Sequence, residues 1–289
     1  MRLTGRRESS NVDDRRGQGF SLSKGKMGIG GIIVAVLISW MLGGNPMDVL
    51  QEVGTSQLTD VTEQSANGKF SAEEEELAKF SRQILAGTED VWTKIFREMG
   101  RTYEPPHMVL YTGSVQTSCG NGQAAMGPFY CSGDQCLYID LSFFSQMKSQ
   151  LGAEGDFAYA YVIAHEVGHH VEYLLGTLDD AHAEMARLPK AEANEVSVRL
   201  ELLADFYAGI WAYHDNEMFG SIEDGDMEEA IHCAHQIGDN YLQEQARGHA
   251  VPESFTHGTS QQRMRWLKLG LATGDMTKGN TFDIPYTSL

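Results

Sequence analysis

The chain has 289 residues, of which 42% are hydrophobic, and its formal net charge is −18. This length and composition allow one sizeable domain with a hydrophobic core, and they exclude a chain that is mostly disordered. Residues 1–26 hold seven Lys or Arg and three Asp or Glu, so the remainder holds 15 basic and 37 acidic residues. Because so acidic a surface repels a phosphate backbone, we expect no nucleic-acid partner.

The basic residues 1–26 precede an uncharged and mostly apolar stretch, residues 27–44. A helix of that length nearly matches the hydrocarbon thickness of a bilayer, and a basic flank is typical of the cytoplasmic side. We therefore expect a basic cytoplasmic tail, a single-pass transmembrane anchor over 27–44 and the bulk of the chain outside. A cleaved signal peptide and a buried helix remain alternatives. The polar composition of residues 45–69 is typical of a linker, so the folded domain is expected over 70–289.

The pattern of the domain changes from helix to strand and back to helix. Ser71 and the glutamates after it form a capping-type start for a helix that runs to about Met99, with a candidate interruption at Gly87-Thr88. Short strand-like runs follow over 108–111, 124–130 and 137–141, and helices are then expected over 153–175, 192–213, 226–245 and 260–271. This order predicts an α+β fold, with a small sheet ahead of a mainly helical second half.

Four cysteines lie beyond the apolar stretch, which is compatible with two disulfides in an exported domain. Four cysteines allow three pairings, and the sequence does not choose among them. One pairing joins Cys119 to Cys131 across a short Gly-rich loop and leaves Cys136 with Cys233.

Two histidines stand four residues apart in the run His165-Glu166-Val167-Gly168-His169. On a helix their rings project from the same face about one turn apart, so both can reach one zinc ion. Glu166 follows the first of them, where its carboxylate can contact a water on the metal without binding the metal itself. The pattern predicts a zinc site with Glu166 as the general base.

A catalytic zinc ion needs a third protein ligand and an open position for water. A third histidine further along the same helix is excluded, because Glu172 and Leu175 stand where that variant of the motif has Gly and His. A glutamate on the following helix is the other solution. There Glu201 and Asp205 lie one turn apart, so Glu201 can complete the zinc shell while Asp205 accepts the free ring N–H of a ligand. Glu195 is the competing ligand.

Several segments together resemble a bacterial family, the putative neutral zinc metallopeptidases. They are His165-Glu166-Val167-Gly168-His169-His170, Glu201-Leu202-Leu203-Ala204-Asp205, Ala208-Gly209-Ile210-Trp211, Ile237-Gly238-Asp239, Phe255 to Arg263, Gly127-Pro128-Phe129-Tyr130-Cys131, and the basic tail with its anchor. The resemblance covers nearly the whole chain and implies a zincin-like fold and a domain on the outer side of the bacterial inner membrane. Phe206 departs from the family, whose members often carry Cys there, which leaves the disulfides open and the metal ligands untouched.

These features predict a membrane-anchored metallopeptidase that uses one zinc ion per chain to hydrolyse a peptide or protein substrate. His257 is the first candidate for a donor to the developing oxyanion; Arg263 is the second, or it supports the ligands together with Asp205. The strand over 137–141 either binds an extended substrate along its edge or lies inside the sheet. Two other functions stay open, a zinc-containing binding or assembly protein without turnover and a zinc amidase acting on cell-wall peptides.

Overall fold

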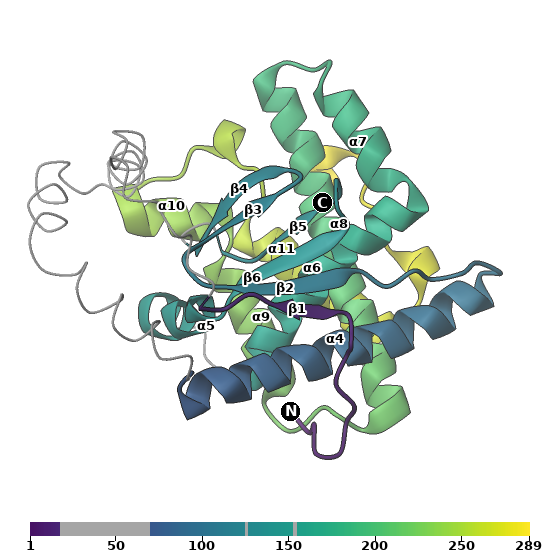
Figure 1. Ribbon diagram of the computed structural model, residues 1–289. Coiled ribbons are helices and arrows are strands. Elements are labelled where there is room, and N and C mark those ends of the chain that lie inside the picture. Colours follow the sequence, from purple (N-terminus) through teal and green to yellow (C-terminus); the bar gives the residue numbers. More distant parts are fainter. Residues whose placement is uncertain (18–69, 125–126, 153–154) are drawn as a thin grey trace, which may run out of the picture.

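The computed structural model describes residues 1–17, 70–124, 127–152 and 155–289, and within them it confirms the expected α+β class (Figure 1). The strands are β1 (Val12–Asp14), β2 (His107–Tyr111), β3 (Ser114–Thr117), β4 (Gly120–Gln123), β5 (Phe129–Cys131) and β6 (Cys136–Asp140). The α-helices are α4 (Ala72–Glu98), α5 (Ser142–Gln146), α6 (Asp156–Leu175), α7 (Thr177–Met185), α8 (Lys190–Phe219), α9 (Asp226–Gln236), α10 (Asp239–Arg247) and α11 (Ser260–Thr273). Shorter helical segments are η3 (Met147–Leu151), η4 (Pro252–Ser254), η5 (Met276–Lys278) and η6 (Tyr286–Ser288).

The main sheet has four strands in the order β1-β2-β6-β5. The pairs β1–β2 and β2–β6 are parallel, and β5 runs antiparallel to β6. Because side chains alternate along a strand, Met108 and Leu110 of β2 face the helices while Val109 and Tyr111 face the opposite way, toward Val115 of the β3–β4 hairpin. The sheet therefore has both faces covered and separates the helical core from a smaller one.

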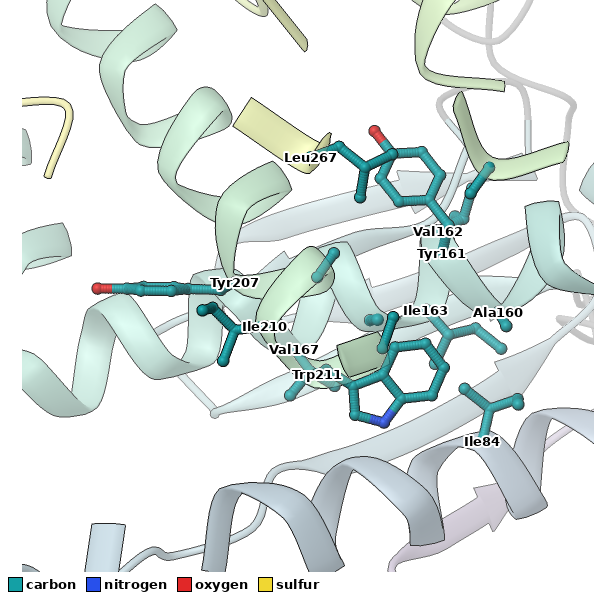
Figure 2. Close-up of a cluster of buried hydrophobic side chains, with 14 of the residues drawn as sticks. Ile84, Ala160, Tyr161, Val162, Ile163, Val167, Tyr207, Ile210, Trp211 and Leu267 are labelled. Atoms are coloured by element: carbon teal, nitrogen blue, oxygen red, sulfur yellow. The ribbon is translucent and has the colours of Figure 1, made fainter. Parts of the chain in front are cut away.

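The helical core lies where α6 and α8 pack together between α4 and α11. Figure 2 shows Ile84 of α4, side chains from α6 such as Ile163 and Val167, and Trp211 of α8 in one buried cluster. Trp211 is 1% exposed, and a buried aromatic ring of this size contributes strongly to a core. This packing holds α6 and α8 rigidly against each other.

Helix α4 begins at the capping box that the sequence predicts and then continues without a break. The Ser71 hydroxyl accepts the N–H of Glu74, whose carboxylate accepts the N–H of Ser71. The interruption expected at Gly87-Thr88 is wrong. A Cβ on Gly87 would stand 2.8 Å from both Arg6 and Asp215, so glycine serves a close contact here and does not end the helix.

The strand pattern differs from the prediction around residues 124–130. Ala124 follows the end of β4, and β5 begins only at Phe129. Most of the run over 137–141 forms β6, which lies between β2 and β5; β2 pairs along its whole length, and β5 pairs with residues 136–138. Of the two alternatives for this strand, the structure therefore supports the one that places it inside the sheet, over residues 136–138.

One of the two bridges in the cysteine pairing is present. Cys119 and Cys131 form a disulfide that ties the β3–β4 turn to β5. Cys136 and Cys233 are free thiols, so the second bridge is wrong. The main sheet separates these two thiols. Cys136 packs on the face that the hairpin covers, while Cys233 is buried in the helical core on the other face.

The basic N-terminal residues belong to the folded domain. Val12–Asp14 form β1, which pairs with β2, and the amino group of Met1 contacts Asp156 at the start of α6. Arg6 binds the buried carboxylate of Asp215 at 2.7 Å. The prediction of a tail separate from the domain is therefore wrong for residues 1–17, whose long-range partners left no local signal in the sequence.

The predicted anchor over 27–44 and the linker over 45–69 lie outside the described residues. Within those residues, no helix has both the length and the apolar character that crossing a membrane requires.

The Arg6–Asp215 ion pair provides a test of whether residues 1–17 pack against the rest of the domain. Replacing Arg6 with Ala leaves a buried carboxylate, 1% exposed, without its cation, so we expect the free energy of unfolding to fall by about 3 kcal/mol. Arg2→Ala is the matched control, because Arg2 is 64% exposed and contacts Glu223 only at 3.5 Å. Denaturant unfolding of both variants measures the difference, and equal stability would mean that the N-terminal residues do not dock.

Candidate metal centre

Helix α6 carries the two histidines on a mostly buried surface. It begins at Asp156 and ends at Leu175, and the capping residue Gly176 takes the left-handed conformation that glycine adopts most easily. His165 and Glu166 are 7% and 8% exposed, and His169 is partly buried. A helix buried on almost every side holds these polar groups in fixed positions.

Helix α8 comes unusually close to α6 at the centre of the motif. A Cβ on Gly168 would stand 2.9 Å from the carbonyl oxygen of Ala204 and 3.0 Å from its Cα. Only a glycine facing a small residue allows two helix backbones to approach so closely. Since Ala204 lies between Glu201 and Asp205 on α8, this contact brings both carboxylates to the histidine pair.

The imidazole nitrogens and the Glu201 carboxylate converge on one point. Nε2 of His165 lies 3.2 Å from Glu201 Oε2, and Nε2 of His169 lies 3.6 Å from Glu201 Oε1. All three ligand atoms lie within 4.8 Å of one another, as a single metal ion requires. Glu195, the competing ligand, is exposed on α8 and lies outside this group.

Asp205 holds the ring of His165 from behind. Its Oδ1 lies 2.8 Å from Nδ1 of His165 and accepts the Tyr161 hydroxyl at 2.6 Å. Arg263 donates to both carboxylate oxygens at 2.9 Å, so it lies buried behind the histidine and supports Asp205. Burial alone would raise the pKa of Asp205, but Arg263 and His165 hold it below its usual value. An ionised Asp205 only accepts hydrogen bonds, so Nδ1 of His165 carries its proton and Nε2 points toward Glu201.

Arg263 reaches this position because α11 packs very closely on α8. A Cβ on Gly209 of α8 would stand 2.8 Å from the Cα of Gly270 on α11 and 2.4 Å from the carbonyl oxygen of Leu267. These two glycines let the helices touch, and the approach carries the start of α11 over the metal centre.

Glu172 contacts the ring of His169 in the same way that Asp205 contacts the ring of His165, a role that was not predicted from the sequence. Its Oε2 lies 2.9 Å from Nδ1 of His169, and the side chain is fully buried. Burial raises the pKa of Glu172 to about 7, although His169 opposes the shift. The spacing of three residues on one helix could have revealed this pair, since such residues are neighbours on a helix surface.

The carboxylates make the centre favourable for positive charge. Burial lowers the pKa of His165, but Asp205 and Glu201 outweigh it and raise the pKa to about 10. Burial also lowers the pKa of His169, and Glu172 and Glu201 reverse that shift as well. Two imidazole nitrogens and one carboxylate, each facing the same point, are a ligand set that suits zinc.

Glu166 lies beside the ligands in an open cavity of about 420 Å³. Burial raises the pKa of its carboxyl, against the opposite effect of His165 and His169. The cavity is lined by Gly127, Pro128, Phe129, Tyr130, Phe143, Tyr161, Val162, His165, Glu166, His169, Glu201, Ile237, Leu242, His257 and Arg263. The candidate metal ligands and the expected base therefore face a space large enough for part of a peptide.

His257 reaches this cavity from a loop that Asp239 holds in place. One oxygen of Asp239 accepts the backbone N–H groups of Thr256, His257 and Gly258, and the other lies 3.3 Å from the His257 ring. The Glu201 charge raises the pKa of His257, and Asp239 adds to the effect. In the sequence, Asp239 stood out only through the family resemblance, and its hydrogen bonds to this loop were not predicted.

The edge strand β5 is fixed to α6 through His170. Nε2 of His170 lies 2.7 Å from the backbone oxygen of Glu104 and must donate to it, so Nδ1 accepts the Tyr130 hydroxyl at 2.9 Å. Burial lowers the pKa of His170 to about 4, which keeps the ring neutral. This histidine therefore positions the strand that forms one wall of the cavity.

The geometry first defines a class, an α+β protein with a three-residue candidate metal centre on two packed helices. A family model described as putative neutral zinc metallopeptidase matches residues 1–282, and the chain belongs to that family. The uncharacterized protein YpfJ of Escherichia coli strain K12 is 48% identical over 291 residues, 98% of this chain and 99% of that protein. The uncharacterized protein Mb2605 of Mycobacterium bovis is 40% identical over 190 residues, 62% of this chain and 63% of that protein. No solved structure matches.

The contact between α6 and α8 can be tested at Gly168. In an ordinary helix interior, Gly→Ala stabilises by about 1 kcal/mol, because alanine has the higher helix propensity. We expect Gly168→Ala to destabilise the protein by about 1–3 kcal/mol instead, because the new methyl group would press on the backbone at Ala204. Denaturant unfolding gives the sign of the change in the free energy of unfolding. A stabilised variant would mean that the two helices do not touch here.

Proposed function

We propose that this protein is a zinc-dependent peptidase in which His165, His169 and Glu201 hold the metal ion. One observation carries the proposal: each histidine is turned by its own carboxylate so that both Nε2 atoms face Glu201. Within the described residues this group offers three ligands, which suits a catalytic zinc ion with an open position better than a closed four-ligand structural site. The zinc-containing assembly protein is therefore the weaker alternative.

The roles of the surrounding residues follow from where they lie. Zinc, when bound, supplies a Lewis acid that acidifies water and polarises a carbonyl group. Glu166 accepts a proton from the attacking water and passes it to the nitrogen of the departing amine. His257, which lines the cavity beside Glu201, donates to the carbonyl oxygen as negative charge develops there.

The substrate binds along β5 in this proposal. β5 is the sheet edge next to the cavity, and Phe129 and Tyr130 of this strand line the cavity wall. An extended peptide can add to such an edge through main-chain hydrogen bonds, and this is a general mode of peptide recognition. A peptide or protein substrate therefore fits the site. Cell-wall peptides are the alternative substrates, to be tested in the same assay.

The proposal predicts that substitutions at two carboxylates have different effects on zinc binding and on hydrolysis. We expect Glu166→Gln to keep one zinc ion per chain and to lose at least about 10²-fold in kcat, because only the proton carrier is removed. We expect Glu201→Gln to lose both zinc and hydrolysis, because a neutral amide is a poor zinc ligand. Zinc content after dialysis and cleavage of a peptide library and of cell-wall peptides measure the two properties.

Glu195→Gln is the matched control, because Glu195 lies on the same helix as Glu201 but is exposed and outside the ligand group. It should keep wild-type zinc content and activity. A metal-loaded Glu166→Gln protein with unchanged turnover would contradict the base assignment. Stoichiometric zinc without hydrolysis of any substrate by the wild type would favour the assembly protein.

The oxyanion role of His257 has a separate test. His257→Ala should lower kcat by about 10²–10³-fold with little change in KM, because the donor acts mainly as charge develops on the carbonyl oxygen. The loop should keep its shape, since Asp239 holds it through three backbone N–H groups. His257→Gln, which restores a donor, should recover part of kcat, and the exposed His249→Ala should change nothing. Equal kcat in His257→Ala and the wild type would exclude the role.

A further inference from the structure

A third cysteine stands beside the Cys119–Cys131 bridge, and the proposed chemistry gives it no role. Cys136 is a free thiol directly opposite Cys131 in the antiparallel pairing of β5 with β6. Opposite residues in such a pair have Cα atoms about 4.5–5.5 Å apart. A disulfide spans about 4.4–6.8 Å between Cα atoms. The register therefore places Cys136 where it can bond to Cys131 while the sheet keeps its pairing.

The sulfur atoms of the three cysteines gather at the turn between β5 and β6. Cys131 and Cys136 pack in the same small core under the hairpin. A Cβ on Gly133 in this turn would stand 3.6 Å from Sγ of Cys119 and 3.7 Å from Sγ of Cys131. The Cys136 thiol donates to the backbone oxygen of Asp134 in the same turn, at 3.3 Å. Because Cys131 is fully buried, its sulfur is shielded from solvent but adjoins a neighbouring thiol.

We infer that Cys119, Cys131 and Cys136 form a thiol–disulfide exchange site, in which Cys136 takes the place of Cys119 in the bridge. The Cys136 thiol gives its proton to water, and its sulfur attacks Sγ of Cys131. The new S–S bond forms as the Cys119–Cys131 bond breaks, and Cys119 leaves as a thiolate that takes a proton from water. One disulfide and one thiol are present before and after the step, so it needs no oxidant or reductant.

The surroundings of Cys136 keep this exchange slow in the resting protein. Burial and the charge of Asp134 raise the pKa of the Cys136 thiol, although Tyr138 and Arg15 oppose the shift. Only the thiolate attacks a disulfide, so the rate is low at neutral pH and rises with pH. The free thiol and the Cys119–Cys131 bridge can therefore stand side by side.

The exchange would free the β3–β4 hairpin from a covalent link to β5. The hairpin packs on the ring of Phe129, since a Cβ on Gly122 would stand 2.5 Å from that ring. Phe129 also lines the cavity, so a loosened hairpin would disturb the strand along which the substrate binds in our proposal. Slower hydrolysis by the exchanged form is therefore expected, and this consequence rests on the proposed function.

Labelling of thiols tests the exchange directly. The full chain is incubated with a bulky maleimide at mildly alkaline pH and digested in acid, and mass spectrometry then maps its labels and bridges. In the wild type, the exposed Cys119 should carry the label while Cys131 is bridged to Cys136. Cys136→Ser should lose the label on Cys119, because no thiol is left to displace it. An intact Cys119–Cys131 bridge in the labelled wild type would overturn the inference.

Cys233→Ala is the matched control, because Cys233 is a free thiol that is buried in the other core. It should keep the wild-type label on Cys119. A second measurement uses Cys119→Ser, in which oxidised glutathione should close a Cys131–Cys136 bridge and be reduced to its thiol. Failure of this bridge to form in the folded variant would also overturn the inference.

Hydrolysis separates the inference from the proposed function. Cys136→Ser, which keeps the native bridge, should cleave peptides like the wild type, whereas the bridged Cys119→Ser protein should show a several-fold lower kcat/KM. Equal rates in these two variants would overturn the link between the exchange and the cavity. Hydrolysis without exchange would overturn the inference and leave the proposed function standing. Exchange without hydrolysis by the wild type would support the exchange site and overturn the peptidase.

Discussion

The close approach of α6 and α8 at Gly168 and Ala204 is the constraint on which the candidate metal centre depends. Two histidines on one helix supply only two ligands. The third has to come from a side chain on a neighbouring helix whose backbone lies at a fixed distance from the first. The absence of a side chain at Gly168 sets that distance. Glu201 lies three residues before Ala204 and Asp205 lies one residue after it. The same contact that joins the helices therefore also fixes the positions of both carboxylates.

A buried carboxylate is costly without a cation, and for Asp205 the fold supplies one from helix α11. Asp205 is fully buried and would be costly alone, but Arg263 binds both of its oxygens. That arginine arrives only because Gly209 and Gly270 let α11 touch α8. The centre therefore depends on two helix pairings, α6 with α8 and α8 with α11, and the candidate ligands cannot be moved independently of the core.

The sequence predicted the parts of this arrangement that depend on local spacing. His165, His169, Glu201 and Asp205 are related by helical turns, so their faces follow from periodicity once the helices are assigned. The partners that are far apart in the chain could not be found this way. Arg6 meets Asp215 across 209 residues, and nothing near Arg6 indicates it.

The same limit explains the errors in the sheet. An apolar run predicts a strand but not its neighbours, so the sequence predicted neither the place of β6 between β2 and β5 nor the pairing of β1 with β2. That pairing has a consequence for function. An open sheet has two edges that can accept a foreign strand, and β1 occupies the edge far from the metal centre. The chain thereby covers β2 with its own N-terminal residues and leaves β5, held by His170 and the Cys119–Cys131 bridge, as the edge beside the cavity.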